Sequence, residues 1–110
     1  MPRAILLVES RPSSPDREDE YNDWYDNTHL KEVCAIPGFV GARRYQLSEK
    51  GLFPNEAGAS PYLAVYELDT DDLSAALQEL GVRAGDGRLK MSDAMSMDPI
   101  PTMTLYELRD

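Results

Sequence analysis

The sequence predicts an α+β fold in which four strands form one antiparallel sheet and two helices cover one of its faces. Short stretches rich in branched apolar residues predict the strands, and apolar residues that recur every three or four positions predict the helices. These stretches alternate along the chain. The 110 residues suffice for one domain with a single two-layer core, so we expect one domain over residues 1–110.

The first expected strand runs from Arg3 to Glu9, a short apolar stretch with several branched residues. Ser14 and Pro15 predict the start of a helix, because a hydroxyl N-cap is followed by proline at the first helical position. The acidic residues between 16 and 20 suit the positive end of the helix dipole. We expect this helix to run to Ala35. Its apolar stripe consists of Tyr21, Trp24, Tyr25 and Thr28.

The remaining elements follow from the same patterns. They are a strand over Phe39–Leu47, a loop over residues 48–60, a strand over Tyr62–Leu68 and a strand over Thr102–Leu108. Before the last strand, apolar residues at helical spacing predict a second helix, capped by Asp69 or Thr70 and ended by Gly81. Residues 83–97 are expected to form a turn and a short helix.

The order β-α-β, loop, β-α-β is the ferredoxin-like plan, and right-handed crossovers leave few alternatives. Such a sheet carries its helices on one face only. Both faces of the first strand are nevertheless apolar, with Ile5 and Leu7 on one side and Leu6 and Val8 on the other. The simplest cover for the second face is the sheet of a second copy related by two-fold symmetry, so we expect a homodimer.

The composition disfavours several kinds of partner. The net charge of −9 would repel nucleic acid and anionic membranes. The longest apolar run, Ala4 to Val8, is far shorter than the ~20 residues that span a bilayer. No signal-peptide pattern is present at the N-terminus, and the single cysteine, Cys34, fits a reducing compartment. We therefore expect a cytoplasmic protein that binds neither nucleic acid nor membrane.

One stretch of the chain carries a more specific pattern. A WYxxxHL helix end over Trp24–Leu30 is followed by a PGF turn at Pro37–Phe39 and by a strand with an arginine and an aromatic residue at Arg44 and Tyr45. This pattern resembles the EthD-like members of the dimeric α+β barrel superfamily. The resemblance is sharpest over residues 20–47 and topological elsewhere. It implies a homodimer whose sheets pack face to face and a pocket in each subunit between sheet and helices.

Members of that wider superfamily include polyketide cyclases, monooxygenases without a prosthetic group, haem-degrading enzymes and proteins of no known activity. The fold therefore does not decide the function. We expect an enzyme without a cofactor that moves a proton on a hydrophobic carbonyl compound, in a cyclisation, isomerisation or dehydration. The open alternatives are a non-catalytic ligand-binding or accessory protein, a cofactor-free monooxygenase and a haem-handling protein.

His29 is the main candidate for catalysis, because it is the only histidine in the chain. Its ordinary pKa of ~6.5 suits a general acid or base, and positioned proton transfer is typically worth about 10²–10⁴ in rate. Asp26 and Glu32 lie on either side of it in the helix, and either could orient the ring. Tyr25 could share the site. The other interpretation is that His29 only interacts with the dipole at the end of its helix.

Aromatic residues and one arginine complete the expected site. Arg43 and Arg44 point to opposite faces of their strand, and the family pattern favours Arg44 as the inward one, able to steady an enolate. The expected ligand-binding residues are Trp24, Arg44, Tyr45 and Tyr66. Each of the aromatic residues could equally belong to the core. One histidine and one cysteine do not make an ordinary zinc site, so no metal is expected.

Overall fold

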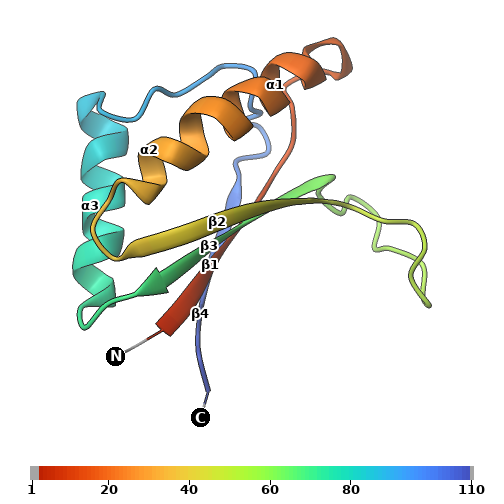
Figure 1. Ribbon diagram of the computed structural model, residues 1–110. Coiled ribbons are helices and arrows are strands. Elements are labelled where there is room, and N and C mark those ends of the chain that lie inside the picture. The colour runs from red at the N-terminus through yellow and green to blue at the C-terminus, as the bar shows by residue number, and fades with distance from the viewer. Residues whose placement is uncertain (1–2, 110) are drawn as a thin grey trace.

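The computed structural model describes residues 3–109. A four-stranded antiparallel sheet carries helices on one face (Figure 1). The strands are β1 (Arg3–Ser10), β2 (Phe39–Gln46), β3 (Tyr62–Asp69) and β4 (Thr102–Glu107). Their order in the sheet is β2-β3-β1-β4, and every neighbouring pair is antiparallel. This is the ferredoxin-like arrangement, so the predicted fold class is confirmed.

One long helical segment connects β1 to β2, as predicted, but the type of helix changes along it. The parts are a 3-10 turn η1 (Pro15–Arg17), α1 (Glu18–Trp24), a π-helical turn η2 (Tyr25–His29) and α2 (Leu30–Cys34). Ser14 has the extended backbone of an N-cap, yet its hydroxyl hydrogen-bonds to the Asp16 carboxylate and caps no backbone N–H. The predicted capping bond is therefore wrong, although the position of the helix start is right.

The second helix, α3 (Leu73–Asp86), is longer than predicted. Its N-cap is Asp72, whose carboxylate accepts the Ala75 N–H at 3.0 Å. The helix continues through Gly81 and ends at Gly87, whose φ of 89° is left-handed. The additional turn lengthens the helical layer that covers the sheet.

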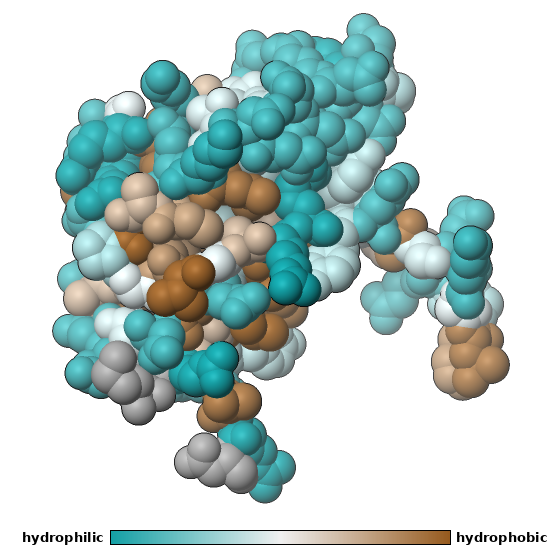
Figure 2. All heavy atoms as spheres, viewed as in Figure 1, coloured by the Kyte–Doolittle hydropathy of each residue, from teal (hydrophilic) through white to brown (hydrophobic). Residues whose placement is uncertain are grey.

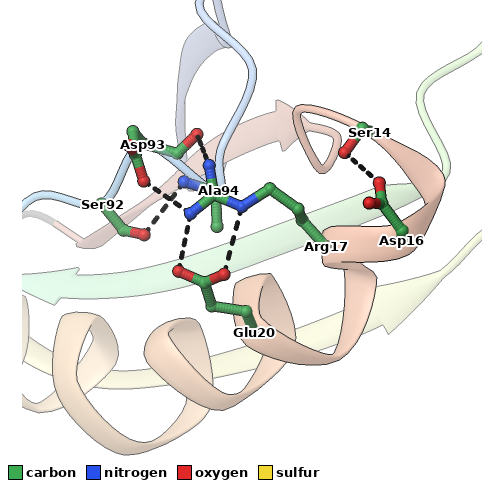
Figure 3. A network of polar contacts seen from close by, with 7 residues as sticks. All are labelled: Ser14, Asp16, Arg17, Glu20, Ser92, Asp93 and Ala94. Atoms are coloured by element: carbon green, nitrogen blue, oxygen red, sulfur yellow. Dashed lines mark hydrogen bonds and ion pairs between the residues drawn. The ribbon is translucent and has the colours of Figure 1, made fainter.

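Residues 88–101 form an irregular segment between α3 and β4, so the short helix predicted there is absent. An ion-pair network ties this segment to the first helical segment (Figure 3). Arg17 Nη2 lies 2.6 Å from Asp93 Oδ1 and 2.7 Å from Glu20 Oε2. The network holds residues from both ends of the chain together beside the helical layer.

The core lies between the sheet and the helices. Along β1 and β3, side chains alternate between a buried face and an open face. The buried apolar residues include Leu6, Val8, Tyr21, Tyr25, Val33, Ile36, Ala64, Tyr66 and Leu68. The open face also carries large apolar residues, and Figure 2 shows apolar side chains gathered over the strands. No helix among residues 3–109 is long and apolar enough to cross a membrane.

Candidate functional site

The π-helical turn η2 places aromatic rings around His29. The Leu30 N–H donates to the Tyr25 carbonyl five residues earlier, the bond that defines such a turn. This wider turn brings residues five apart above one another. Trp24 therefore stacks on His29 with ring centroids 4.6 Å apart, and Tyr25 meets the same ring edge-on at 5.1 Å. Turns of this kind occur frequently at functional sites.

His29 is buried and lines a cavity of about 200 Å³ between the sheet and the helical layer. The wall of this cavity is mostly apolar. Tyr25 and Tyr66 line it from the first helical segment and from β3. All the methionines within residues 3–109 also line it, and they are Met91, Met95, Met97 and Met103. Because thioether side chains are flexible and polarisable, this wall can adapt to ligands of irregular shape.

Three polar atoms of the cavity-lining residues are buried and have no hydrogen-bond partner among the described residues. They are Nδ1 of His29, Oη of Tyr25 and Oη of Tyr66. A buried polar group without a partner typically costs about 1–3 kcal/mol. Such groups are rare in folded proteins unless they serve a function. The residues that line the cavity therefore hold unused hydrogen-bonding capacity.

Burial sets the protonation states of these groups. It lowers the pKa of His29 to about 4, and the negative charge of Glu32 raises that pKa only in part. The imidazole is therefore neutral near pH 7. Burial also raises the pKa of Tyr25 and the pKa of Tyr66, so both phenols keep their protons. The site combines a neutral base with two neutral hydrogen-bond donors.

Neither carboxylate proposed from the sequence orients His29. The Asp26 carboxylate accepts a hydrogen bond from Arg44 Nη1 at 3.0 Å, and Glu32 accepts the Lys90 N–H at 2.7 Å. Within residues 3–109, no hydrogen bond joins either carboxylate to the imidazole. The reason is the wide turn, which places Tyr25 against His29 and leaves Asp26 to the arginine. Asp26 therefore does not assist His29 directly, contrary to the prediction.

Arg44 and Tyr45 point to opposite faces of β2. Arg44 pairs with Ala64 on the buried face, where its side chain is only 11% exposed. Its guanidinium lies 4.4 Å from the centroid of the Tyr25 ring, a cation–π contact. Arg44 thus supports Tyr25 and does not itself line the cavity. Tyr45 pairs with Leu63 on the open face and is 50% exposed, so it does not line the cavity beside His29.

Trp24 and Tyr66 take different positions relative to the cavity. Tyr66 lines the cavity, while Trp24 forms the support behind the imidazole and does not line the cavity. The indole N–H of Trp24 donates to the Lys90 carbonyl at 2.6 Å, which fixes both the ring and the start of the segment that carries the methionines. Of the predicted site residues, the structure brings His29, Tyr25 and Tyr66 together at the cavity.

The methionine wall and the π-helical turn were not predicted from the sequence. A signal for the turn was present, because four buried residues recur at a constant spacing of four, wider than the 3.6 of an α-helix. They are Tyr21, Tyr25, His29 and Val33.

In the described part of the chain, no group of three or more His, Cys, Asp or Glu side chains is placed to hold a metal ion.

Comparison with known proteins identifies the fold. No family model matches the chain, and no curated protein matches its sequence. An EthD (ethyl tert-butyl ether D) family protein from Bacillus halodurans has a similar structure, with 15% identity, a TM-score of 0.60 and coverage of 99% of this chain and 100% of its own.

Two further solved structures are similar over nearly their full length. A candidate monooxygenase from Shewanella loihica is 16% identical with a TM-score of 0.59, and the match covers 100% of this chain and 98% of its own. A dimeric ferredoxin-like protein from an uncultured marine organism is 13% identical with a TM-score of 0.56, covering 98% and 96%. The chain therefore has the fold of EthD-like and dimeric ferredoxin-like proteins, as the sequence pattern predicted.

Proposed function

We propose that the protein binds a small, mostly apolar molecule with a carbonyl or phenol oxygen and moves a proton on it. The reaction would be a cyclisation, an isomerisation or a dehydration. One observation carries the proposal: a neutral, buried His29 and the unpartnered phenols of Tyr25 and Tyr66 belong to the wall of one apolar cavity. A mostly apolar pocket with a few convergent polar groups is typical of small-molecule sites.

The cavity limits the size of the ligand. Its volume is about 200 Å³, and an engineered apolar cavity of about 150 Å³ in another protein holds benzene. We therefore expect a molecule with one or two small rings. The methionines around the cavity suit a flat, polarisable molecule because thioethers make favourable contacts with aromatic rings.

In the proposed reaction, His29 removes a proton from the carbon next to the carbonyl group. The neutral imidazole is the form that accepts a proton, and burial maintains this form near neutral pH. The phenols of Tyr25 and Tyr66 donate hydrogen bonds to the enolate oxygen as its negative charge develops. The imidazolium and the enolate form side by side, so each charge offsets the cost of the other in the apolar cavity.

Deuterium exchange into a simple ketone tests this proposal without knowledge of the natural substrate. The probe is 2-tetralone in D2O, and NMR measures the loss of the protons next to its carbonyl above the buffer rate. We expect His29→Gln to lower the protein-dependent rate by about 10² or more. Tyr45→Phe, on the open face of the sheet, is the matched control and should exchange at the normal rate. Equal rates for His29→Gln and the unmodified protein would exclude His29 as the base.

A homodimer is part of the proposal. The open face of the sheet carries the apolar residues Ile5, Leu7, Leu63, Val65 and Tyr106. A face of this kind on a monomer would expose a large apolar patch to water. At least one protein of the same fold is described as dimeric. Light scattering should give twice the chain mass, and a monomer at micromolar concentration would contradict the homodimer.

Ligand binding without turnover is the second candidate. Within residues 3–109, no side chain hydrogen-bonds to Nδ1 of His29. Such a bond would fix the tautomer that a general base needs, so its absence favours binding without turnover. In that case 2-tetralone would raise the melting temperature without any exchange of its protons. Oxygen consumption with 1,4-dihydroxynaphthalene would instead indicate cofactor-free monooxygenase chemistry.

A further inference from the structure

An arm between β2 and β3 ends in two uncovered apolar side chains. The arm, residues 47–61, projects away from the sheet (Figure 1), and Figure 2 shows apolar atoms at its far end. Leu52 is 90% exposed and Phe53 is 78% exposed. Two hydrogen bonds hold the arm to its own chain without involving the tip: the Leu47 N–H donates to the Pro61 carbonyl at 2.8 Å, and Arg11 Nη2 donates to the Gly58 carbonyl at 3.1 Å. Both apolar side chains of the tip are therefore exposed in the single chain.

The mouth of the His29 cavity is a second uncovered apolar feature. Met97, Ile100 and Met103 line the cavity, and each is more than half exposed. They lie immediately before and at the start of β4. Met103 pairs with Val8 on the helix side of the sheet, so sheet-to-sheet packing alone would not cover this mouth. The cavity is incomplete in the single chain.

The strand order determines where the arm points in a sheet-to-sheet dimer. β2 and β4 are the two edge strands of the sheet. Three antiparallel pairs, β2–β3, β3–β1 and β1–β4, lie between one edge and the other, so β2 and β4 run in opposite directions. A two-fold axis parallel to the strands preserves strand direction and exchanges the two edges. The β2 edge of one subunit then lies beside the β4 edge of its partner, so both exposed edges are paired.

In this arrangement the arm meets the partner's cavity. The arm leaves β2 after Gln46, and in an antiparallel β2–β4 contact this end of β2 lies beside the start of the partner's β4 at Thr102. The mouth residues occupy that position. A two-fold axis perpendicular to the strands would place β2 beside β2 and leave both the tip of the arm and the mouth in water. The burial of apolar surface favours the first arrangement.

We propose that the arm of each subunit closes the mouth of the partner's cavity, with Leu52 and Phe53 packed against the partner's Met97 and Ile100. This inference rests on the homodimer put forward under the proposed function. Each site is then built from two chains: one supplies His29 and the phenols, and the other supplies the apolar cover. The cover excludes water from the imidazole and strengthens every polar interaction inside the cavity.

Cysteine cross-linking tests the arrangement directly. In a Cys34→Ser background, chains with Phe53→Cys and chains with Ile100→Cys are co-expressed with different tags and oxidised. We expect a disulfide that joins one chain of each kind. Phe53→Cys combined with Val82→Cys, an exposed position on α3, is the matched control and should give no such product. A dimeric sample without the mixed disulfide would overturn the proposal and leave the homodimer standing, whereas a monomeric sample would overturn both.

Ligand affinity gives an independent test of the cover. Phe53→Ala should leave the dimer intact and weaken the binding of 2-tetralone by about fivefold, because the loss of part of an apolar contact is worth about 1 kcal/mol. Val82→Ala removes a similar exposed side chain elsewhere and should bind normally. Calorimetry measures the affinity and light scattering measures the mass. Unchanged affinity in a dimeric Phe53→Ala protein would refute the closing of the mouth by the arm.

Discussion

The burial of His29 should make the stability of the protein fall as the pH falls from about 6.5 to about 4. Burial lowers the pKa of His29 from 6.5 to about 4 in the folded protein. In the unfolded chain the same imidazole returns to its ordinary pKa of about 6.5. Between these two values the unfolded state binds more protons than the folded state. Stability therefore rises with pH across this window and decreases on acidification.

The size of the effect follows from the two pKa values. A shift of one unit corresponds to about 1.4 kcal/mol, so acidification from about pH 7.5 to about pH 4.5 should remove about 2.5 kcal/mol of stability through His29 alone. Urea unfolding followed by circular dichroism, at a fixed protein concentration, measures the free energy at each pH. The control is His29→Gln, because its side chain does not titrate.

The difference in unfolding free energy between the unmodified protein and His29→Gln isolates the contribution of His29. Carboxylates such as Asp16 and Asp93, whose pKa values are lowered by the hydroxyl of Ser14 and the guanidinium of Arg17 respectively, also lose stabilising contacts on acidification. These losses occur equally in the unmodified protein and in His29→Gln, so they cancel in the difference. Parallel stability curves for the two proteins over the whole window would refute the account of a buried, neutral imidazole.

Three further substitutions have defined outcomes. Gly38→Ala should cost more stability than Gly87→Ala. Both glycines have a positive φ, which strains an alanine by about 1–2 kcal/mol. Only at Gly38 would the new Cβ also lie 3.2 Å from the Cβ of Ala76. Urea unfolding measures the difference, and equal losses would contradict the close approach. Tyr66→Phe should leave stability unchanged or slightly higher, because its hydroxyl has no partner, and should weaken 2-tetralone binding about 2–10-fold by calorimetry. Asp26→Asn should keep the exchange rate within about twofold, since Asp26 hydrogen-bonds to Arg44 and not to His29. A loss comparable to that of His29→Gln would restore Asp26 as a catalytic residue.

The strands and the order of the elements could be predicted because their apolar patterns are local. β1 and β3 are short apolar runs rich in branched residues, and the structure places each strand within a residue or two of the expected bounds. The orientation of Tyr45 was harder to predict, since both sides of β2 mix apolar and polar residues. A β-bulge between Phe39 and Gly41 shifts the register and thereby decides which residues face the helices. A local pattern does not contain this information.

The length of α3 depends on side chains that meet only in three dimensions. Gly81 suggested an end to the helix because glycine costs about 1 kcal/mol relative to alanine. The structure continues the helix, with Arg83 paired to Glu79 at 2.8 Å and Arg88 reaching the same carboxylate at 3.6 Å. The site shows the same limitation. His29 and Tyr25 are close in the sequence, but Tyr66 and the methionines join them only through the fold.

The single imidazole of this chain allows the central claim to be tested by one measurement. With one histidine in a tag-free protein, NMR of the ring nitrogens reports on His29 alone. The account predicts a neutral ring throughout the neutral range, with a protonation midpoint near 4, and ring signals that shift when 2-tetralone binds. An imidazole that titrates at its ordinary value of about 6.5 and does not respond to the ketone would contradict a buried base in a ligand cavity.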